Sequence, residues 1–158
     1  MKTYTPRLLL DRNVMTDGLI SRFGQSKAIL ALCAAKTCRL VLPEINRIEV
    51  ERNLLKLVDR VGEEATEQII ADYEGFLRLA RPIRVPLPDG ERVKANRTLI
   101  RHLADVPVVL AAIDSNPDWL ITRNRDHFTD KVAERIGIRI ASPQEFFDSL
   151  IESFGGQI

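Results

Sequence analysis

Short apolar runs recur along the chain, separated by segments in which the hydrophobic residues follow a different spacing. The first run, Leu8-Leu9-Leu10, lies between Arg7 and Asp11 and is continuous rather than alternating. A continuous run of this length is typical of a strand that is buried on both faces of a parallel sheet. Four such runs predict strands at Leu8–Leu10, Arg39–Leu42, Trp119–Thr122 and Ile138–Ile140.

Between these runs the apolar residues follow the three- and four-residue spacing of helices. A stripe from Ile69 to Ala80 predicts one helix from about Glu63 to Leu79. A second, apolar helix opens at Asp105-Val106-Pro107 and ends near Asn116-Pro117, because proline disfavours helical geometry in the residue before it. Capping residues and first-turn prolines predict further helix starts at Ser26, Pro43, Thr129 and Ser142.

The segment from Arg81 to Ile100 breaks both patterns. Its prolines and an Asp89-Gly90 pair impose extended and turn geometry, so we expect a long irregular connection or a short excursion of strands. Elsewhere strands alternate with helices, which indicates an α/β fold with a parallel sheet. We expect residues 1–158 to form a single domain, since no linker, repeat or low-complexity tract divides them.

Composition narrows the class of protein. The chain has 158 residues, 23 Lys and Arg against 22 Asp and Glu, and 45% hydrophobic residues, as in ordinary globular proteins. A net charge of +1 argues against a protein held to nucleic acid by a broad basic field, although it leaves room for a local basic surface. No apolar run approaches the roughly 18 residues of a membrane span, and the start leads into only three leucines, so we expect a cytoplasmic protein without a membrane partner.

Acidic and amide side chains follow the predicted strands. Asp11 comes directly after the first run, and Asn124 and Asp126 follow the strand that begins at Trp119. In a parallel sheet, ligands bind outside the carboxyl ends of the strands, so these side chains converge if the two strands are neighbours. Glu49 and Asp105, each on a nearby helix, could join them. Converging carboxylates repel one another unless a cation is present, which favours Mg²⁺ or Mn²⁺ and in-line hydrolysis of a phosphodiester.

In this order and spacing, the motifs resemble those of the PIN-domain nucleases, most closely the toxins of bacterial toxin–antitoxin pairs. The matching pieces are Leu8-Leu9-Leu10-Asp11-Arg12-Asn13, Leu42-Pro43-Glu44 onward to Glu49, Asp105 heading an Ala-rich helix, Trp119 to Phe128, and Gly137 to Phe147. The resemblance implies a three-layer α/β/α fold with about five parallel strands. It also implies a metal-dependent ribonuclease selective for single-stranded RNA, an antitoxin protein as partner, and a homodimer.

The resemblance also implies roles for individual residues. Asp11, Glu49 and Asp105 would be metal-binding carboxylates, with Asn124 or Asp126 as the fourth member of the site. Thr122 or Asn13 would support them with hydrogen bonds. Three positions depart from the family pattern: Arg12 replaces a small hydroxyl residue, Asn124 stands where many relatives carry Asp, and His102 stands where one branch carries an additional Asp. Glu44 and Glu51 leave the register of Glu49 open.

Each assignment has a structural alternative. Asp11 could simply cap the turn after its strand, Asp105 could be a helix cap, and Glu49 could belong to a solvated charged face. Three functions follow: the ribonuclease, a catalytically decayed PIN-like module that binds RNA or protein, or a phosphohydrolase or phosphoacceptor of another fold. Basic residues between 81 and 101, together with Arg123 and Arg125, are candidates for phosphate contacts, whereas neither histidine is assigned to acid–base catalysis.

Overall fold

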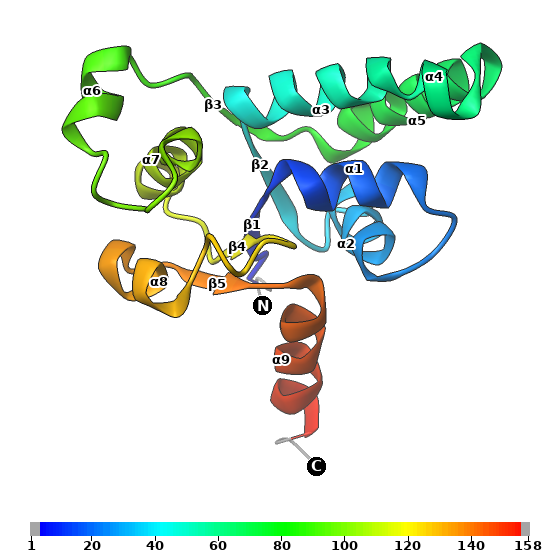
Figure 1. The fold of residues 1–158 in the computed structure, drawn as a ribbon. Helices are drawn as coiled ribbons and strands as arrows, with labels where there is room; N and C mark the ends of the chain where they lie inside the picture. Colours follow the sequence, from blue (N-terminus) through cyan, green and yellow to red (C-terminus); the bar gives the residue numbers. More distant parts are fainter. Residues whose placement is uncertain (1–3, 156–158) are drawn as a thin grey trace.

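The computed structural model describes residues 4–155, and its centre is a five-stranded sheet in the order β3-β2-β1-β4-β5 (Figure 1). Every neighbouring pair of strands is parallel. The strands span Arg7–Leu10 (β1), Arg39–Pro43 (β2), Ile83–Val85 (β3), Trp119–Ile121 (β4) and Arg139–Ala141 (β5). The four predicted strands are thus confirmed, and β3 is the strand that the proline-rich segment left open.

Side chains along each strand alternate between two cores. Leu8 and Leu10 of β1 face one core, and Leu9 faces the other. On the first core lie α1 (Arg12–Ile20), α2 (Gln25–Ala34), α3 (Glu44–Lys56), α5 (Glu63–Ala80) and α9 (Pro143–Gly155). The short α4 (Val58–Val61) connects α3 to α5. On the second core lie α7 (Val106–Ser115) and α8 (Asp130–Ile136), so the predicted three-layer α/β/α fold is confirmed.

Two of the predicted helix starts, Thr129 and Ser142, coincide with side-chain capping interactions. Thr129 accepts a hydrogen bond from the Val132 backbone N–H at 3.3 Å. Ser142 and Glu145 exchange backbone-to-side-chain bonds of 3.1 and 3.0 Å, which form a capping box. The prediction of Ser26 as a cap was wrong: Gly24, with φ +119°, precedes α2, and Ser26 is buried inside its first turn.

Three helices were missed in the sequence: α1, the short α4 between α3 and α5, and α6. α1 begins directly after Asp11, where mixed polar and apolar residues give only a weak amphipathic signal. The short α6 (Gly90–Ala95) lies in the segment predicted to be irregular, and the Asp89 side chain caps it by accepting from the Arg92 N–H at 2.8 Å. A 3₁₀ turn, η1 (Leu103–Asp105), then leads into α7. Among the described helices, none is long and apolar enough to cross a membrane.

Candidate metal site at the carboxyl edge of the sheet

Asp11 lies where β1 passes into α1 at the carboxyl edge of the sheet. Its backbone N–H continues the pairing with β4 by donating to the Ile121 carbonyl at 2.9 Å. Its carboxylate accepts from the Thr122 hydroxyl at 2.8 Å and from the Arg12 backbone N–H at 2.8 Å. The residue is only 4% exposed. The parallel pairing of β1 with β4 therefore brings Asp11 and the residues after β4 together, as the sequence predicted.

Burial raises the pKa of Asp11, and the nearby charge of Asp105 adds to that rise. The hydrogen bonds from Thr122 and the Arg12 backbone, with the charge of Arg12, oppose the rise without cancelling it. A buried carboxylate with a raised pKa destabilises the folded protein when it is ionised. A bound cation would offset that cost.

Asp105 ends η1 at the start of α7 and is 6% exposed. Its Oδ2 lies 2.8 Å from Nδ1 of His127, which stands in the turn between β4 and α8. The His127 ring stacks on His102 with centroids 3.6 Å apart. The side chain of Asp105 makes no capping bond to the α7 backbone, so capping does not account for this carboxylate.

Glu49 faces the site from α3, but a neighbouring side chain engages it. Arg12 Nη1 lies 2.6 Å from Glu49 Oε2. The other two acids that left the register open, Glu44 and Glu51, instead pair with Arg47 on the same helix. The structure thus turns Glu49, and not its neighbours, toward the first residues of α1.

The two residues proposed to complete the site are placed differently. Asn124 donates its backbone N–H to the Thr122 hydroxyl at 3.0 Å and so supports the Thr122–Asp11 bond. Asp126 is exposed in the turn after β4. Among residues 4–155, no three His, Cys, Asp or Glu side chains are grouped closely enough to hold a metal ion. As arranged, the oxygen ligands that fit a hard divalent cation are the two buried carboxylates of Asp11 and Asp105.

Asn46 is a residue of this edge that the sequence reasoning missed. It is fully buried on α3, and its Nδ2 donates to the Leu10 carbonyl at 2.8 Å, next to Asp11. Its Oδ1 is buried without a hydrogen-bond partner. The signal was available, because Asn46 shares the buried stripe of α3 with Val50 and Leu54, where a polar residue is unexpected.

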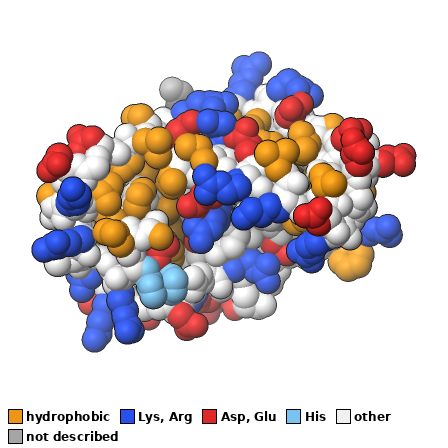
Figure 2. All heavy atoms as spheres, turned by 45° about the horizontal axis from the view of Figure 1, so that its top comes forward, with side chains coloured by type: hydrophobic (Ala, Val, Ile, Leu, Met, Phe, Trp, Pro, Cys, Tyr) orange, Lys and Arg blue, Asp and Glu red, His pale blue; other side chains and the backbone are white. Residues whose placement is uncertain are grey.

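A hollow of about 420 Å³ opens along α1, which begins directly after Asp11, and Arg12, Arg60 and Arg123 lie in its lining. Figure 2, in which the top of Figure 1 comes forward, shows basic side chains around acidic ones on the middle of this face. Arg123 also pairs with Asp17 at 3.1 Å. Arg125 takes no part in the hollow, because it is held by Glu145, Asp130 and the Phe128 carbonyl. Of the two predicted phosphate-contact arginines after β4, Arg123 alone lines the hollow.

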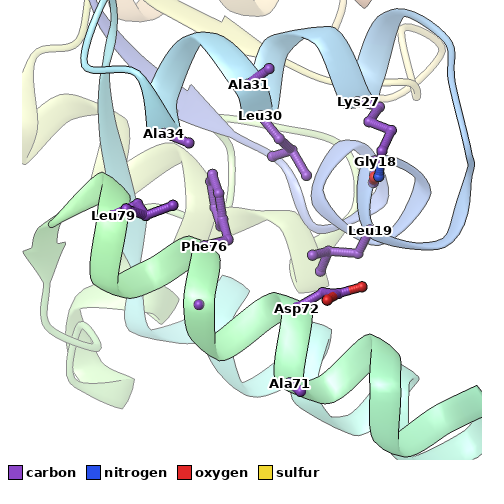
Figure 3. A pocket seen from close by; sticks show the side chains of 11 residues that line it. Gly18, Leu19, Lys27, Leu30, Ala31, Ala34, Ala71, Asp72, Phe76 and Leu79 are labelled. Carbon is purple, nitrogen blue, oxygen red and sulfur yellow. The ribbon is translucent and has the colours of Figure 1, made fainter.

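A second hollow, of about 400 Å³, lies between α1, α2 and α5 and shares no residue with the carboxylate edge. Figure 3 shows Leu19, Leu30 and Phe76 pointing into it. Gly18 permits the close approach of α1 to α2 here, since a Cβ at this position would lie 2.6 Å from Leu30 Cδ1. Such a lining suits apolar groups and not phosphates.

Comparison with known proteins gives a family and a fold. Residues 7–126 match a sequence profile described as "PIN domain". The structure is similar to VapBC2 from Rickettsia felis bound to a DNA fragment from their promoter, with a TM-score of 0.60, 15% identity, and 86% of this chain and 98% of that chain covered. It is also similar to FitAB bound to the IR36 DNA fragment (TM-score 0.61, 17% identity, 86% and 94% covered). The structure is similar to FitAcB from Neisseria gonorrhoeae as well, with a TM-score of 0.58, 14% identity, and 87% of this chain and 98% of that chain covered. No curated protein sequence matches this chain.

Proposed function

This chain belongs to the PIN domain family, whose members are in general nucleases, and on that premise we propose a specific activity. The protein is a Mg²⁺- or Mn²⁺-dependent endoribonuclease that hydrolyses phosphodiester bonds of single-stranded RNA. The observation that carries the proposal is the pair of buried carboxylates, Asp11 and Asp105, together with a hollow lined by Arg12, the residue after Asp11, and by Arg60 and Arg123.

Asp11 and Asp105 would hold the cation. Both are nearly inaccessible to water, and the charge of Asp105 contributes to the raised pKa of Asp11. When bound, a divalent cation supplies Lewis acidity for attack of water on phosphorus. Thr122 and the Arg12 backbone fix the orientation of the Asp11 carboxylate, and His127 fixes that of Asp105. Glu49 and Asp126 remain proposed further ligands that would have to move toward these two residues.

The arginines of the hollow support the proposed substrate class. Arg12, Arg60 and Arg123 offer guanidinium groups that suit phosphate oxygens. Asn13, which also lines the hollow, accepts from the Arg123 backbone N–H at 3.0 Å and so links the hollow to the turn after β4. A flexible single strand can place its phosphate backbone in such a hollow. A duplex is rigid and is recognised across its grooves instead.

We extend the proposal to the biological setting: the protein is the toxin of a toxin–antitoxin pair, acts in the cytoplasm as a homodimer, and is blocked by its antitoxin. Similarity of fold to VapBC2 and FitAB supports this setting. The test is to express the product of the adjacent reading frame with this chain. The expected results are co-elution, loss of RNA cleavage in the complex, and a mass of two chains for the free protein.

A second candidate function is a catalytically decayed PIN-like module that binds RNA or protein. Two observations favour it: Glu49 is engaged by Arg12, and no group of three metal-ligating side chains is assembled within residues 4–155. This alternative predicts RNA binding through the arginine-lined hollow without cleavage.

Cleavage assays separate the two functions. Partner-free protein is incubated with single-stranded RNA and Mn²⁺, with EDTA as the metal-free arm. We expect Asp11→Asn and Asp105→Asn to slow cleavage about a hundredfold or more. Asp114→Asn is the matched control, because Asp114 lies at the far end of α7 from Asp105 and pairs with Arg92. Equal rates for all variants, or no cleavage by the wild type, would exclude the ribonuclease.

A further inference from the structure

Arg12 occupies an unusual position at the carboxylate edge. Its backbone N–H donates to Asp11 at 2.8 Å, and its guanidinium reaches across to Glu49 at 2.6 Å. We propose that Arg12 is a built-in cation that competes with the divalent metal for these carboxylates and releases Glu49 when an RNA phosphate draws it into the neighbouring hollow. RNA binding would then promote metal binding. This inference rests on the proposed ribonuclease function and adds a coupling between substrate and metal.

The charge of Arg12 acts on all three acids of the edge. Burial lowers the pKa of its guanidinium, but the hydrogen bond and charge of Glu49 and the charges of Asp11 and Asp105 outweigh this effect and raise it. A guanidinium stays protonated at every physiological pH. Proton loss therefore cannot clear the site, and a metal has to compete with a permanent positive charge.

The ion pair also limits the ligands available to a metal. While Arg12 holds Glu49, the buried carboxylates left are Asp11 and Asp105, and one oxygen of Asp105 already contacts His127. The affinity of an oxygen-ligand site for a divalent ion depends on how many charged ligands it offers. Weak metal binding by the RNA-free protein follows.

The neighbouring hollow can accept the Arg12 side chain once it leaves Glu49. Its side chain is 40% exposed and lines the same hollow as Arg60 and Arg123. A phosphate in that hollow would offer it a bidentate partner in place of Glu49. Glu49 would then be free to turn toward Asp11 and Asp105. Because coupling between two binding sites is reciprocal, the same exchange makes metal promote RNA binding.

The experiment measures Mn²⁺ affinity by calorimetry, with and without a single-stranded RNA analogue in which a methylene group replaces the bridging phosphodiester oxygen that would leave, so that water cannot cleave it. Arg12→Gln removes the charge and leaves a shorter polar side chain that can still donate a hydrogen bond. We expect it to bind Mn²⁺ about tenfold or more tightly than the wild type. In the wild type, RNA should tighten Mn²⁺ binding by about fivefold or more, and this effect should vanish in Arg12→Gln. Arg12→Lys keeps the charge and should resemble the wild type.

Arg47→Gln is the matched control. It breaks the ion pairs of Arg47 with Glu44 and Glu51 on α3, on the side of the helix about 200° from Glu49. Its Mn²⁺ affinity should equal that of the wild type. Equal affinity of wild type and Arg12→Gln would overturn the role of Arg12 and leave the ribonuclease standing. If no variant binds Mn²⁺ with or without RNA, both the inference and the metal-dependent function fail.

Discussion

Two aspartates mark opposite ends of the central strand pair, and their environments differ in kind. Asp11 follows β1 at the carboxyl edge, whereas Asp118 precedes β4 at the amino edge. Burial raises the pKa of Asp11 despite its hydrogen bonds. Burial also pushes the pKa of Asp118 upward, but bonds from the Arg7 backbone and the Tyr4 hydroxyl, with the charges of Arg7 and Arg139, outweigh it and lower it.

The difference separates a carboxylate whose ionised form its neighbours stabilise from one whose ionised form burial disfavours. The Arg7 N–H and the Tyr4 hydroxyl donate to Asp118 at 2.7 and 2.6 Å, and these bonds hold the strand ends together. Asp11 is also hydrogen-bonded, yet burial, with a smaller contribution from the charge of Asp105, keeps its pKa raised. Burial of such a group without full compensation destabilises the fold, and perturbed carboxylates of this kind cluster at functional sites.

The largest expected contrast comes from adding metal. Mn²⁺ at one hundred times its dissociation constant should stabilise the wild type by about 2.7 kcal/mol. Asp118→Asn should keep this gain, and Asp11→Asn should lose nearly all of it, because only Asp11 belongs to the carboxylate edge. Urea unfolding with and without Mn²⁺ measures both differences. A gain in Asp11→Asn equal to that of the wild type would erase the distinction between the two aspartates.

Removing the support of Asp11 gives the next effect. Thr122→Val deletes the hydroxyl that donates to Asp11 and accepts from the Asn124 N–H. The free energy of unfolding should fall by about 2 kcal/mol, because a buried carboxylate loses a partner. Thr122→Ser keeps the hydroxyl and should stay within about 1 kcal/mol of the wild type. Equal losses for both variants would show that the hydroxyl is not what supports Asp11, because Thr122→Ser keeps it.

The sequence predicts some parts of this edge of the sheet and not others. Continuous apolar runs sufficed for four of the strands, and the convergence of Asp11 with the residues after β4 followed from parallel pairing. β3 has three residues in a proline-rich segment, and α1 has little amphipathic contrast, so local patterns are weak there. Which carboxylates face one another depends on tertiary packing. The Arg12–Glu49 pair joins residues 37 positions apart, and periodicity carries no information on such contacts.

A smaller loss is expected at the amino edge. Asp118→Asn removes the negative charge of the carboxylate that accepts hydrogen bonds from Arg7 and Tyr4. It also removes the attraction of that charge to Arg139. We expect a destabilisation of about 1 kcal/mol, because the group is partly exposed and solvent screens the charge. Urea unfolding at pH 7 provides the measurement. A stabilising effect of Asp118→Asn would contradict the structural role given to this aspartate.

The pH dependence tests the sign of each environment. Asp11 has a raised pKa in the folded state, so it costs stability above that pKa and none below its unfolded value. Asp11→Asn should therefore stabilise the metal-free protein by about 1 kcal/mol at pH 7, and the gain should shrink as the pH falls through the folded pKa.

Asp118 has a lowered pKa, so its stabilisation is present above the unfolded pKa and is lost as the pH falls toward the folded value. The stability that Asp118→Asn loses relative to the wild type should therefore shrink in acid, just as the stability that Asp11→Asn gains should shrink. Unfolding curves from pH 3 to pH 7 measure both trends, and destabilisation by Asp11→Asn that grows with pH would show that its carboxylate is fully compensated.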